Sequence, residues 1–206
     1  MGEKLKTKDK ILTVATEIFY NKGFNGARMQ EIANLANVNK AALHYYFSSK
    51  QELFEVVLLN SFKNLFISFD KVVNSNMPII EKIDVIIEKY LDFIKTNTQN
   101  IKFILNEIEN NLAFIQKNME TNSMKVKFFD EIFEELHLEM EKGTIKKINP
   151  NHLLINIISM CIFPFIAKPL IMEITQFSQE EIQHFFDEQE NFIKKFVHNA
   201  LQQKRE

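Results

Sequence analysis

The most informative segment of this 206-residue chain is Met29-Gln-Glu-Ile-Ala-Asn-Leu-Ala-Asn-Val-Asn-Lys-Ala-Ala-Leu-His-Tyr-Tyr46. Within it, Ile32, Leu35 and Ala36 recur at helical spacing, the pattern breaks at 37–39, and it restarts with Leu43 and either Tyr46 or Phe47. The spacing predicts two short helices joined by a tight turn, with these apolar side chains directed inward. This arrangement is a helix-turn-helix.

Several positions in the stretch have a predictable steric role. Ala33 is small enough for the two helices to cross closely, and Val38 can fill the gap between them. Asn37 falls where the turn requires a left-handed backbone, which Asn tolerates better than most residues. Asn39 is a good N-cap because its side-chain oxygen can accept from an otherwise unpaired backbone N–H.

The second helix leaves an outer face for contacts with DNA. Short side chains there let the backbone approach base edges, while Lys, His and Tyr can reach bases or phosphates. The alternative is an ordinary helical hairpin with a solvated polar face. The residues of this face, with the cap that precedes it, are Asn39, Lys40, Ala41, Ala42, His44 and Tyr45.

The first quarter of the chain resembles the N-terminal DNA-binding domain of the TetR family of bacterial transcriptional regulators. Three positions depart from the family pattern: Asn37 replaces a usual Gly, Ala27 a common Thr or Ser, and His44 a frequent Tyr. The residues that carry the resemblance are Ile11, Leu12, Phe19, Gly23, Phe24, Ile32, Ala33, Val38, Leu43, Tyr45, Tyr46, Phe47, Lys50, Glu52 and Leu53.

The resemblance implies a homodimeric regulator, usually a repressor, that leaves a palindromic operator when a small effector binds. It also implies that Arg28 and Gln30 contact the DNA backbone, and that Tyr46 and Lys50 contact a phosphate. For Tyr46, packing in the core is an equal alternative. Double-stranded DNA, a second copy of the chain and an unidentified small molecule are therefore the expected partners.

Composition favours an all-α protein without disulfides. The chain has four Gly, four Pro and one Cys, which cannot form an intramolecular bridge and fits a reducing compartment. No apolar segment follows the charged N-terminus, so no signal peptide is indicated and a cytoplasmic protein is expected. The most apolar stretch, 153–167, is shorter than the ~20 residues of a spanning helix.

Charge is divided unevenly along the chain. Residues 1–50 carry eight Lys and Arg against four Asp and Glu, whereas the remainder is net acidic. A basic unit can neutralise phosphates and release counterions, which supplies much of the sequence-independent affinity for DNA. We therefore expect a DNA-binding domain over 1–50 and a helical effector-binding and dimerisation domain over 51–206.

Apolar periodicity predicts the helices of both domains. Pro78 permits a helix start, and Ser178 with Glu181 forms a capping-box pattern before the last helix. The expected helices span 7–21, 49–74, 79–96, 101–116, 124–141, 150–172 and the segment after Ser178.

The last two helices carry broad apolar faces that predict a four-helix bundle with a second copy. Burial against the rest of the same chain is the alternative. The predicted interface residues are Leu154, Ile157, Ile158, Cys161, Phe165, Phe185, Phe186, Gln189, Phe192, Ile193 and Phe196.

Seventeen of the twenty phenylalanines follow residue 50, so they either fill a core or line a pocket for a hydrophobic effector. For Asn106 and Asn110, one turn apart, a solvated surface position is the alternative. The predicted effector-binding residues are Phe62, Phe66, Tyr90, Phe93, Phe103, Asn106, Asn110, Phe114, Met124 and Phe128.

An enzyme is not expected. Cys161 and His152 are more than two helical turns apart, too far for a nucleophile and its base. His184 and Glu188 could meet a metal, but no third ligand is evident. There is no Gly-rich phosphate loop, and no cofactor or metal is predicted. The remaining alternative is a DNA-binding or architectural dimer that responds to no effector.

Overall fold

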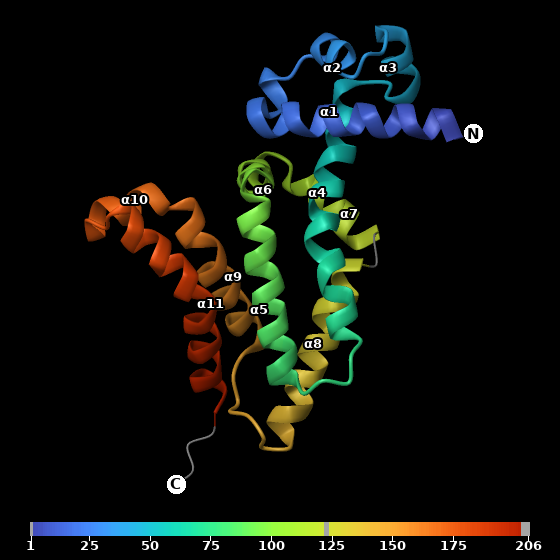
Figure 1. Ribbon diagram of the computed structural model, residues 1–206. Helices are drawn as coiled ribbons and strands as arrows, with labels where there is room; N and C mark the ends of the chain where they lie inside the picture. Colours follow the sequence, from blue (N-terminus) through green and yellow to red (C-terminus); the bar gives the residue numbers. More distant parts are fainter. Residues whose placement is uncertain (1, 122–123, 203–206) are drawn as a thin grey trace. The chain divides into compact units, whose positions relative to one another are not determined.

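The computed structural model describes residues 2–121 and 124–202. Within these ranges, the structure does not describe the side chains of residues 2–5, 64–68, 70, 109, 117–121 and 124–128. The described chain consists of helices, connecting turns and no strand, which confirms the all-α prediction (Figure 1).

Eleven helices are present in the described ranges. They are α1 (Gly2–Gly26), α2 (Met29–Leu35), α3 (Lys40–Tyr46), α4 (Lys50–Val73), α5 (Ile79–Thr96), α6 (Thr98–Asn110), α7 (Leu112–Thr121), α8 (Met124–Glu141), α9 (Pro150–Ile166), α10 (Lys168–Thr175) and α11 (Gln179–Leu201).

The helices divide into two compact units. The first combines Met1–Asn64 with Gln99–Asn118, and the second combines Leu65–Thr98 with Met119–Glu206. The first unit holds the whole helix-turn-helix and extends past residue 50, because the start of α4 and most of α6 and α7 belong to it. The units are therefore not two consecutive halves of the sequence.

A cluster of aromatic rings forms the core of the first unit. The Phe54 ring lies 5.2 Å from Phe19, 4.9 Å from Phe24 and 5.8 Å from Phe103 between centroids, and its side chain is buried. Edge-to-face pairs of this kind are favourable beyond the area they bury. Between Phe19 and Phe24, Gly23 adopts a left-handed φ of 64°, so α1 bends where a side chain would be strained.

The second unit is built around α5, which packs against α8, α9 and α11. Ile87, Leu91 and Ile94 of α5 are fully buried. Lys82 of α5 is also buried, and its ammonium donates to the Glu135 carboxylate at 2.6 Å and to the Val73 carbonyl at 3.0 Å. Pairing of this kind is what permits a buried charge.

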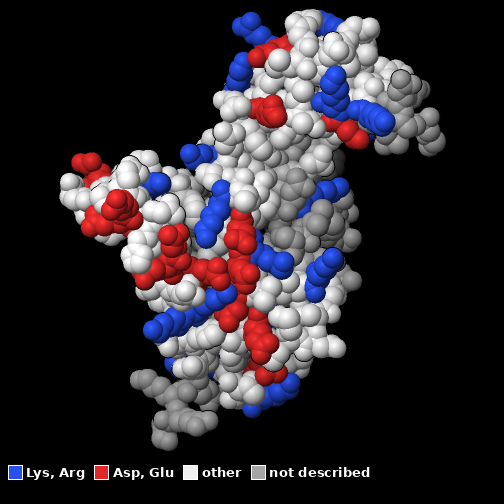
Figure 2. Space-filling model, in the orientation of Figure 1, with Lys and Arg blue, Asp and Glu red and all other residues white. Residues whose placement is uncertain are grey.

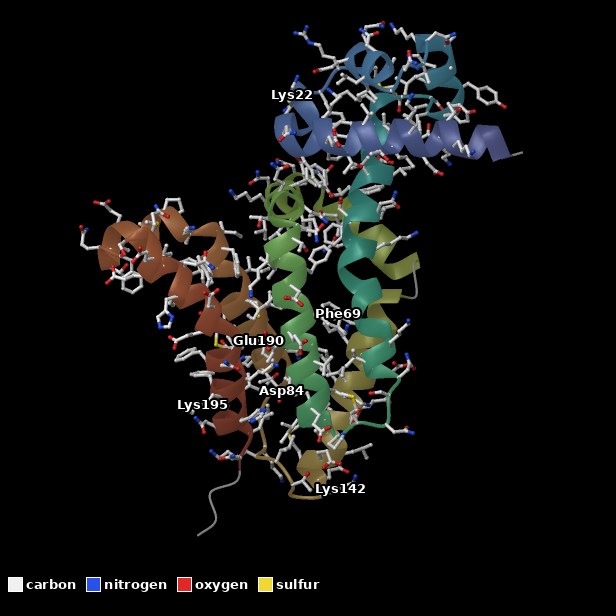
Figure 3. All side chains as sticks on the ribbon, viewed as in Figure 1. Lys22, Phe69, Asp84, Lys142, Glu190 and Lys195 are labelled. Atoms are coloured by element: carbon white, nitrogen blue, oxygen red, sulfur yellow. The ribbon has the colours of Figure 1, made fainter. Side chains whose placement is uncertain are left out.

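Polar contacts attach α11 to α5 within the same unit. His198 meets Asp84 at 2.9 Å, and Lys194 lies 2.6 Å from Glu190 and 3.7 Å from Glu88. Asp84 and Glu190 are labelled in Figure 3. Figure 2 shows acidic side chains running down the visible face of this unit, with Lys and Arg side chains on either side of them.

Two helices predicted as continuous are broken, and these predictions were wrong. Within 101–116, α6 ends at Asn110 and α7 begins at Leu112; Asn111 between them bonds the Glu107 side chain at 2.9 Å. Within 150–172, α9 ends at Ile166 and α10 begins at Lys168. Pro169 lies in the first turn of α10, where a proline is well tolerated because the N–H that it lacks would have no partner within the helix.

Among the described residues, no single helix combines the length and apolar character that a membrane span requires. Taken together, α9 and α10 reach those values by length and composition, although they are bent by 79° at their junction.

Candidate nucleic-acid interface

The turn between α2 and α3 has the geometry that its sequence predicts. Asn37 adopts a left-handed φ of 53°, and the Val38 N–H donates to the Ala33 carbonyl at 3.0 Å. Ala33 is fully buried, as the close crossing of the two helices requires. The predicted steric roles of Ala33 and Asn37 are confirmed.

The start of α3 is held by its cap and by its inward side chains. Asn39 is the N-cap, and its side-chain oxygen accepts from the Ala42 N–H at 2.7 Å. Leu43 and Phe47 are buried, at 0% and 1% exposure. After this bond, the two N–H donors of the Asn39 side chain and the second lone pair of its oxygen remain for an outside contact.

Leu35 was predicted on the inner face of the motif, and this prediction was wrong. Its side chain is 61% exposed, while Ile32, Ala33 and Ala36 are fully buried. At ~100° per residue, the centre of the face formed by those three residues lies roughly 100° around the helix from Leu35. Spacing alone could not distinguish the two faces of so short a helix.

The outer face of α3 is open to solvent. Lys40, Ala41, His44 and Tyr45 are exposed, and the Tyr45 side chain is 69% exposed. Tyr46 is half-buried, with its ring 5.2 Å from the Tyr45 ring. The face therefore presents donors and acceptors around a central alanine, as a helix entering the major groove would need.

The predicted residues flanking α3 lie in the same unit. Arg28 is exposed and precedes α2, Gln30 donates to the Asn34 side-chain oxygen at 2.9 Å, and the Lys50 ammonium lies 4.5 Å from the Phe24 ring. An ion pair of 2.6 Å between Lys22 and Glu31 ties α1 to α2 (Figure 3). These contacts position the motif and leave the cationic group of Arg28 on the surface.

Sequence analysis missed the cap that starts α4. The Ser48 N–H donates to the Glu52 carboxylate at 2.8 Å, and the Glu52 N–H donates to the Ser49 hydroxyl at 3.1 Å. The bonds to Ser48 lower the pKa of the exposed Glu52 carboxyl, because they favour its charged form. The Ser-x-x-Glu pattern over 49–52 is a capping-box signal that could have revealed it.

Nearly half of the predicted dimer-interface residues are buried within the single chain. A side chain that packs inside its own chain offers almost no area to a partner. Gln189, for instance, donates to the Met160 carbonyl at 3.0 Å. The residues concerned are Ile157, Cys161, Phe186, Gln189 and Ile193.

The remaining interface candidates are at least partly exposed. Phe192 and Phe196 are 63% and 51% exposed, and Leu154, Ile158, Phe165 and Phe185 are half-buried. Other apolar side chains on α9, α10 and α11 join them at the surface. Those that sequence analysis did not select are Ile155, Phe163, Ile166, Leu170 and Ile174.

The predicted effector residues are not brought together. Phe103 packs in the first unit against Tyr20 at 4.9 Å and against Phe54, while Tyr90 is buried in the second, where burial raises the pKa of its phenol. Asn106 and Asn110 are exposed, and Phe62, Phe93 and Phe114 are half-buried. The side chains of Phe66, Met124 and Phe128 lie outside the described residues.

An apolar cavity of about 50 Å³ lies elsewhere, between α5, α8 and α9 of the second unit. None of the predicted effector residues lines it. Every side chain around it is a hydrocarbon, and the lining residues are Ile83, Ile86, Phe129, Ile132, Phe133, Leu136, Pro150, Leu153, Leu154 and Ile157.

The side chains considered for catalysis or metal binding do not form a site. Cys161 is fully buried, and burial raises the pKa of its thiol to about 12, so the reactive thiolate is disfavoured. His184 and Glu188 form an exposed pair at 3.5 Å. Within the described residues, no group of three or more His, Cys, Asp or Glu side chains could hold a metal.

Comparisons with known proteins agree with this geometry. The family model described as "Bacterial regulatory proteins, tetR family" matches residues 11–57. The "Probable HTH-type transcriptional regulator YttP" of Bacillus subtilis (strain 168) is 27% identical over 181 residues, covering 86% of each chain.

Two further proteins are similar, one over a shorter stretch and the other over nearly the whole chain at lower identity. The biofilm operon icaADBC negative transcriptional regulator IcaR of Staphylococcus epidermidis is 37% identical over 62 residues, which are 30% of this chain and 33% of that protein. The solved structure of a TetR-family transcriptional regulator from Haemophilus influenzae covers 98% of this chain and 100% of that one, with a TM-score of 0.68 and 18% identity.

These relatives are transcriptional regulators rather than enzymes, and the structural match extends the shared fold over both units. The turn geometry, the capped α3 and the matched segment all fall on the same residues. The chain therefore belongs to the TetR family of bacterial transcriptional regulators.

Proposed function

We propose that this regulator is a homodimer that represses transcription from a palindromic operator and is released by a small hydrophobic effector. The observation that carries the proposal is the outer face of α3, where Lys40, His44 and Tyr45 are exposed around Ala41. A short side chain among polar and aromatic ones suits close approach to base edges. The negative regulator IcaR, which is similar over 30% of the chain, supports repression.

Dimerisation is supported by the apolar surface of α9, α10 and α11. Ile155, Phe163, Ile174 and Phe192 are each at least 59% exposed, on helices α9, α10 and α11, of which α9 contacts both others. Extensive exposed apolar surface marks a site of interaction. A second copy related by a two-fold axis would cover it with the same surface. A dimer would also offer two α3 helices to half-sites about one helical turn, ~34–36 Å, apart or slightly more.

The cavity between α5, α8 and α9 supports an apolar effector, because its lining offers no hydrogen-bonding side chain. An effector would release DNA only if it binds one conformation more tightly than the other. The cavity is far below the roughly 300–1,000 Å³ of typical ligand pockets, so binding would require these helices to separate.

The direct test is a titration of the full chain with the DNA upstream of its own gene and with scrambled DNA, at two salt concentrations. We expect tighter, salt-sensitive binding to the upstream DNA and a loss of roughly tenfold in Tyr45→Ala, since contacts to base edges and to phosphate would be removed. His137→Ala, an exposed histidine on α8, is the matched control. Equal weak binding to both DNAs, confirmed in a genome-wide selection of bound fragments, would contradict the proposal.

The small size of the cavity favours a second candidate, a DNA-binding dimer that responds to no effector. The two candidates differ in thermal stability, because a ligand that binds only the folded state raises the melting temperature. A panel of apolar compounds that produces no shift, with DNA binding intact, would support the second candidate over the first.

A further inference from the structure

His44 on the outer face of α3 has one ring nitrogen engaged inside the protein. Its Nδ1 lies 3.3 Å from the backbone carbonyl oxygen of Ser48, just beyond the end of the helix. The side chain itself is exposed and shares its face with Ala41 and Tyr45. The contact therefore orients the imidazole without burying it.

The contact also determines which nitrogen carries the proton. A carbonyl oxygen can only accept a hydrogen bond, so Nδ1 must be the donor. In a neutral imidazole the other nitrogen, Nε2, then carries a lone pair and is an acceptor. Within the described part of the chain, Nε2 of His44 makes no hydrogen bond, so this acceptor faces solvent.

We infer that His44 is a specificity-determining residue, whose Nε2 accepts from the exocyclic amino group of an adenine or a cytosine in the major groove. The inference rests on the proposed function, since it requires that α3 enter that groove. Among base edges, only adenine N6 and cytosine N4 present donors there. Ala41 on the same face leaves room for the ring to approach.

The same chemistry predicts which bases are rejected. Guanine presents N7 and O6 and thymine presents O4, all of which are acceptors, so their lone pairs would oppose that of Nε2. Lys40 and Arg28 have donors only, so they cannot read an amino group. Neutral His44 thus adds a recognition mode that the cationic side chains of this surface lack.

The experiment begins with the intact wild-type protein and a pool of randomised duplexes at pH 8. The selected site is then measured with each base at every position, for wild type, His44→Ala, His44→Arg and the control His137→Ala. We expect one position per half-site where adenine or cytosine is preferred roughly fivefold to tenfold, as for a single hydrogen bond. His44→Ala should lose this preference, and His44→Arg, a donor only, should move it to guanine.

Atomic changes in the base sharpen the assignment. Replacing the preferred adenine by purine, or the preferred cytosine by 2-pyrimidinone, removes only the amino group. Wild type and His137→Ala should lose the same fivefold to tenfold in affinity, whereas His44→Ala should be indifferent to the change. Nitrogen NMR of the free protein should find the proton of His44 on Nδ1.

The outcomes separate the inference from the function on which it rests. If no sequence is enriched by the wild type, the proposed function itself is overturned. If a site is enriched but His44→Ala weakens binding equally for all four bases, His44 is only a helix-end contact and the inference is wrong. A proton found on Nε2, or an unchanged base preference in His44→Arg, would overturn it as well.

Discussion

Two surfaces of the molecule lie outside the core of their unit: the outer face of α3, and the exposed face of α9 and α11. The first is mainly polar and aromatic, whereas the second is apolar. On α3, charged and aromatic groups surround a small residue, and the side chains turned inward are Leu43 and Phe47. On α11, Phe192 is 63% exposed beside Ile193, which is fully buried.

The two surfaces are therefore recognised by different properties. A surface for DNA differs in residue type from the core beneath it, so polarity separates the two at once. A surface for a second copy of the chain has the same residue types as the core, so only packing separates them.

The largest effect is expected in the core beneath the α3 surface. Phe54→Ala removes a buried ring that contacts Phe19, Phe24 and Phe103, and should lower the free energy of unfolding by about 3–5 kcal/mol. Tyr45→Ala, on the surface itself, should change it by less than ~0.5 kcal/mol while weakening DNA binding. Chemical denaturation of both variants measures the two changes in the free energy of unfolding. Equal destabilisation would contradict the distinction between the buried Phe54 and the exposed Tyr45.

On α11, two adjacent residues carry the same contrast. Ile193→Ala should destabilise the folded chain by about 2–4 kcal/mol, because it leaves a cavity in the core. Phe192→Ala should instead weaken self-association, seen as a dimer dissociation constant raised about tenfold or more in sedimentation experiments. A variant of Phe192 that remains as dimeric as wild type would show that this exposed face is not the interface.

Removal of a helix cap should lower stability by a smaller amount, similar in the two units. Ser178 begins α11 with a capping box, in which its hydroxyl accepts from the Glu181 N–H at 3.2 Å, and Asn39 caps α3. Ser178→Ala and Asn39→Ala should each lower stability by about 1 kcal/mol. Only Asn39→Ala should also reduce DNA affinity, since only that cap orients the surface proposed to bind it. Thermal melts and DNA titrations of both variants test this.

The smallest effect concerns a buried carboxyl of the first unit. Burial raises the pKa of Glu107 on α6, although its bond from Asn111 opposes the rise. Because the folded chain then holds this proton more tightly than the unfolded chain, stability should fall as pH rises from the unfolded pKa through the folded one. Glu107→Gln should remove that slope and be more stable than wild type near neutral pH. Urea midpoints across this pH range check it, and an unchanged slope would contradict it.

Much of the first unit could be predicted from sequence because its constraints are local. The left-handed Asn37, the cap at Asn39 and the inward Leu43 each follow from a neighbour a few residues away, so residue type and spacing suffice. Leu35 is the exception. On a helix of seven residues, three buried positions already define the inner face, and a fourth apolar residue at similar spacing is left outside.

The candidate sites of the second unit could not be predicted in the same way. Seventeen phenylalanines after residue 50 predict either a packed core or a ligand pocket, and composition alone does not distinguish the two. Phe103 joined the aromatic core of the first unit, while the cavity formed among mainly aliphatic side chains of α5, α8 and α9. A cavity is a property of how helices meet, which no single helix encodes.

By itself, the sequence determined that this protein is all-helical and carries a helix-turn-helix with exposed Lys40, His44 and Tyr45, because backbone conformation and capping depend on near neighbours. The tertiary structure alone decided that Cys161 and Ile193 are core residues, that Phe192 is surface, and that Nδ1 of His44 meets the Ser48 carbonyl. The physical reason is that apolar burial is non-directional: periodicity shows that a face must be covered, and only the packed chain shows what covers it.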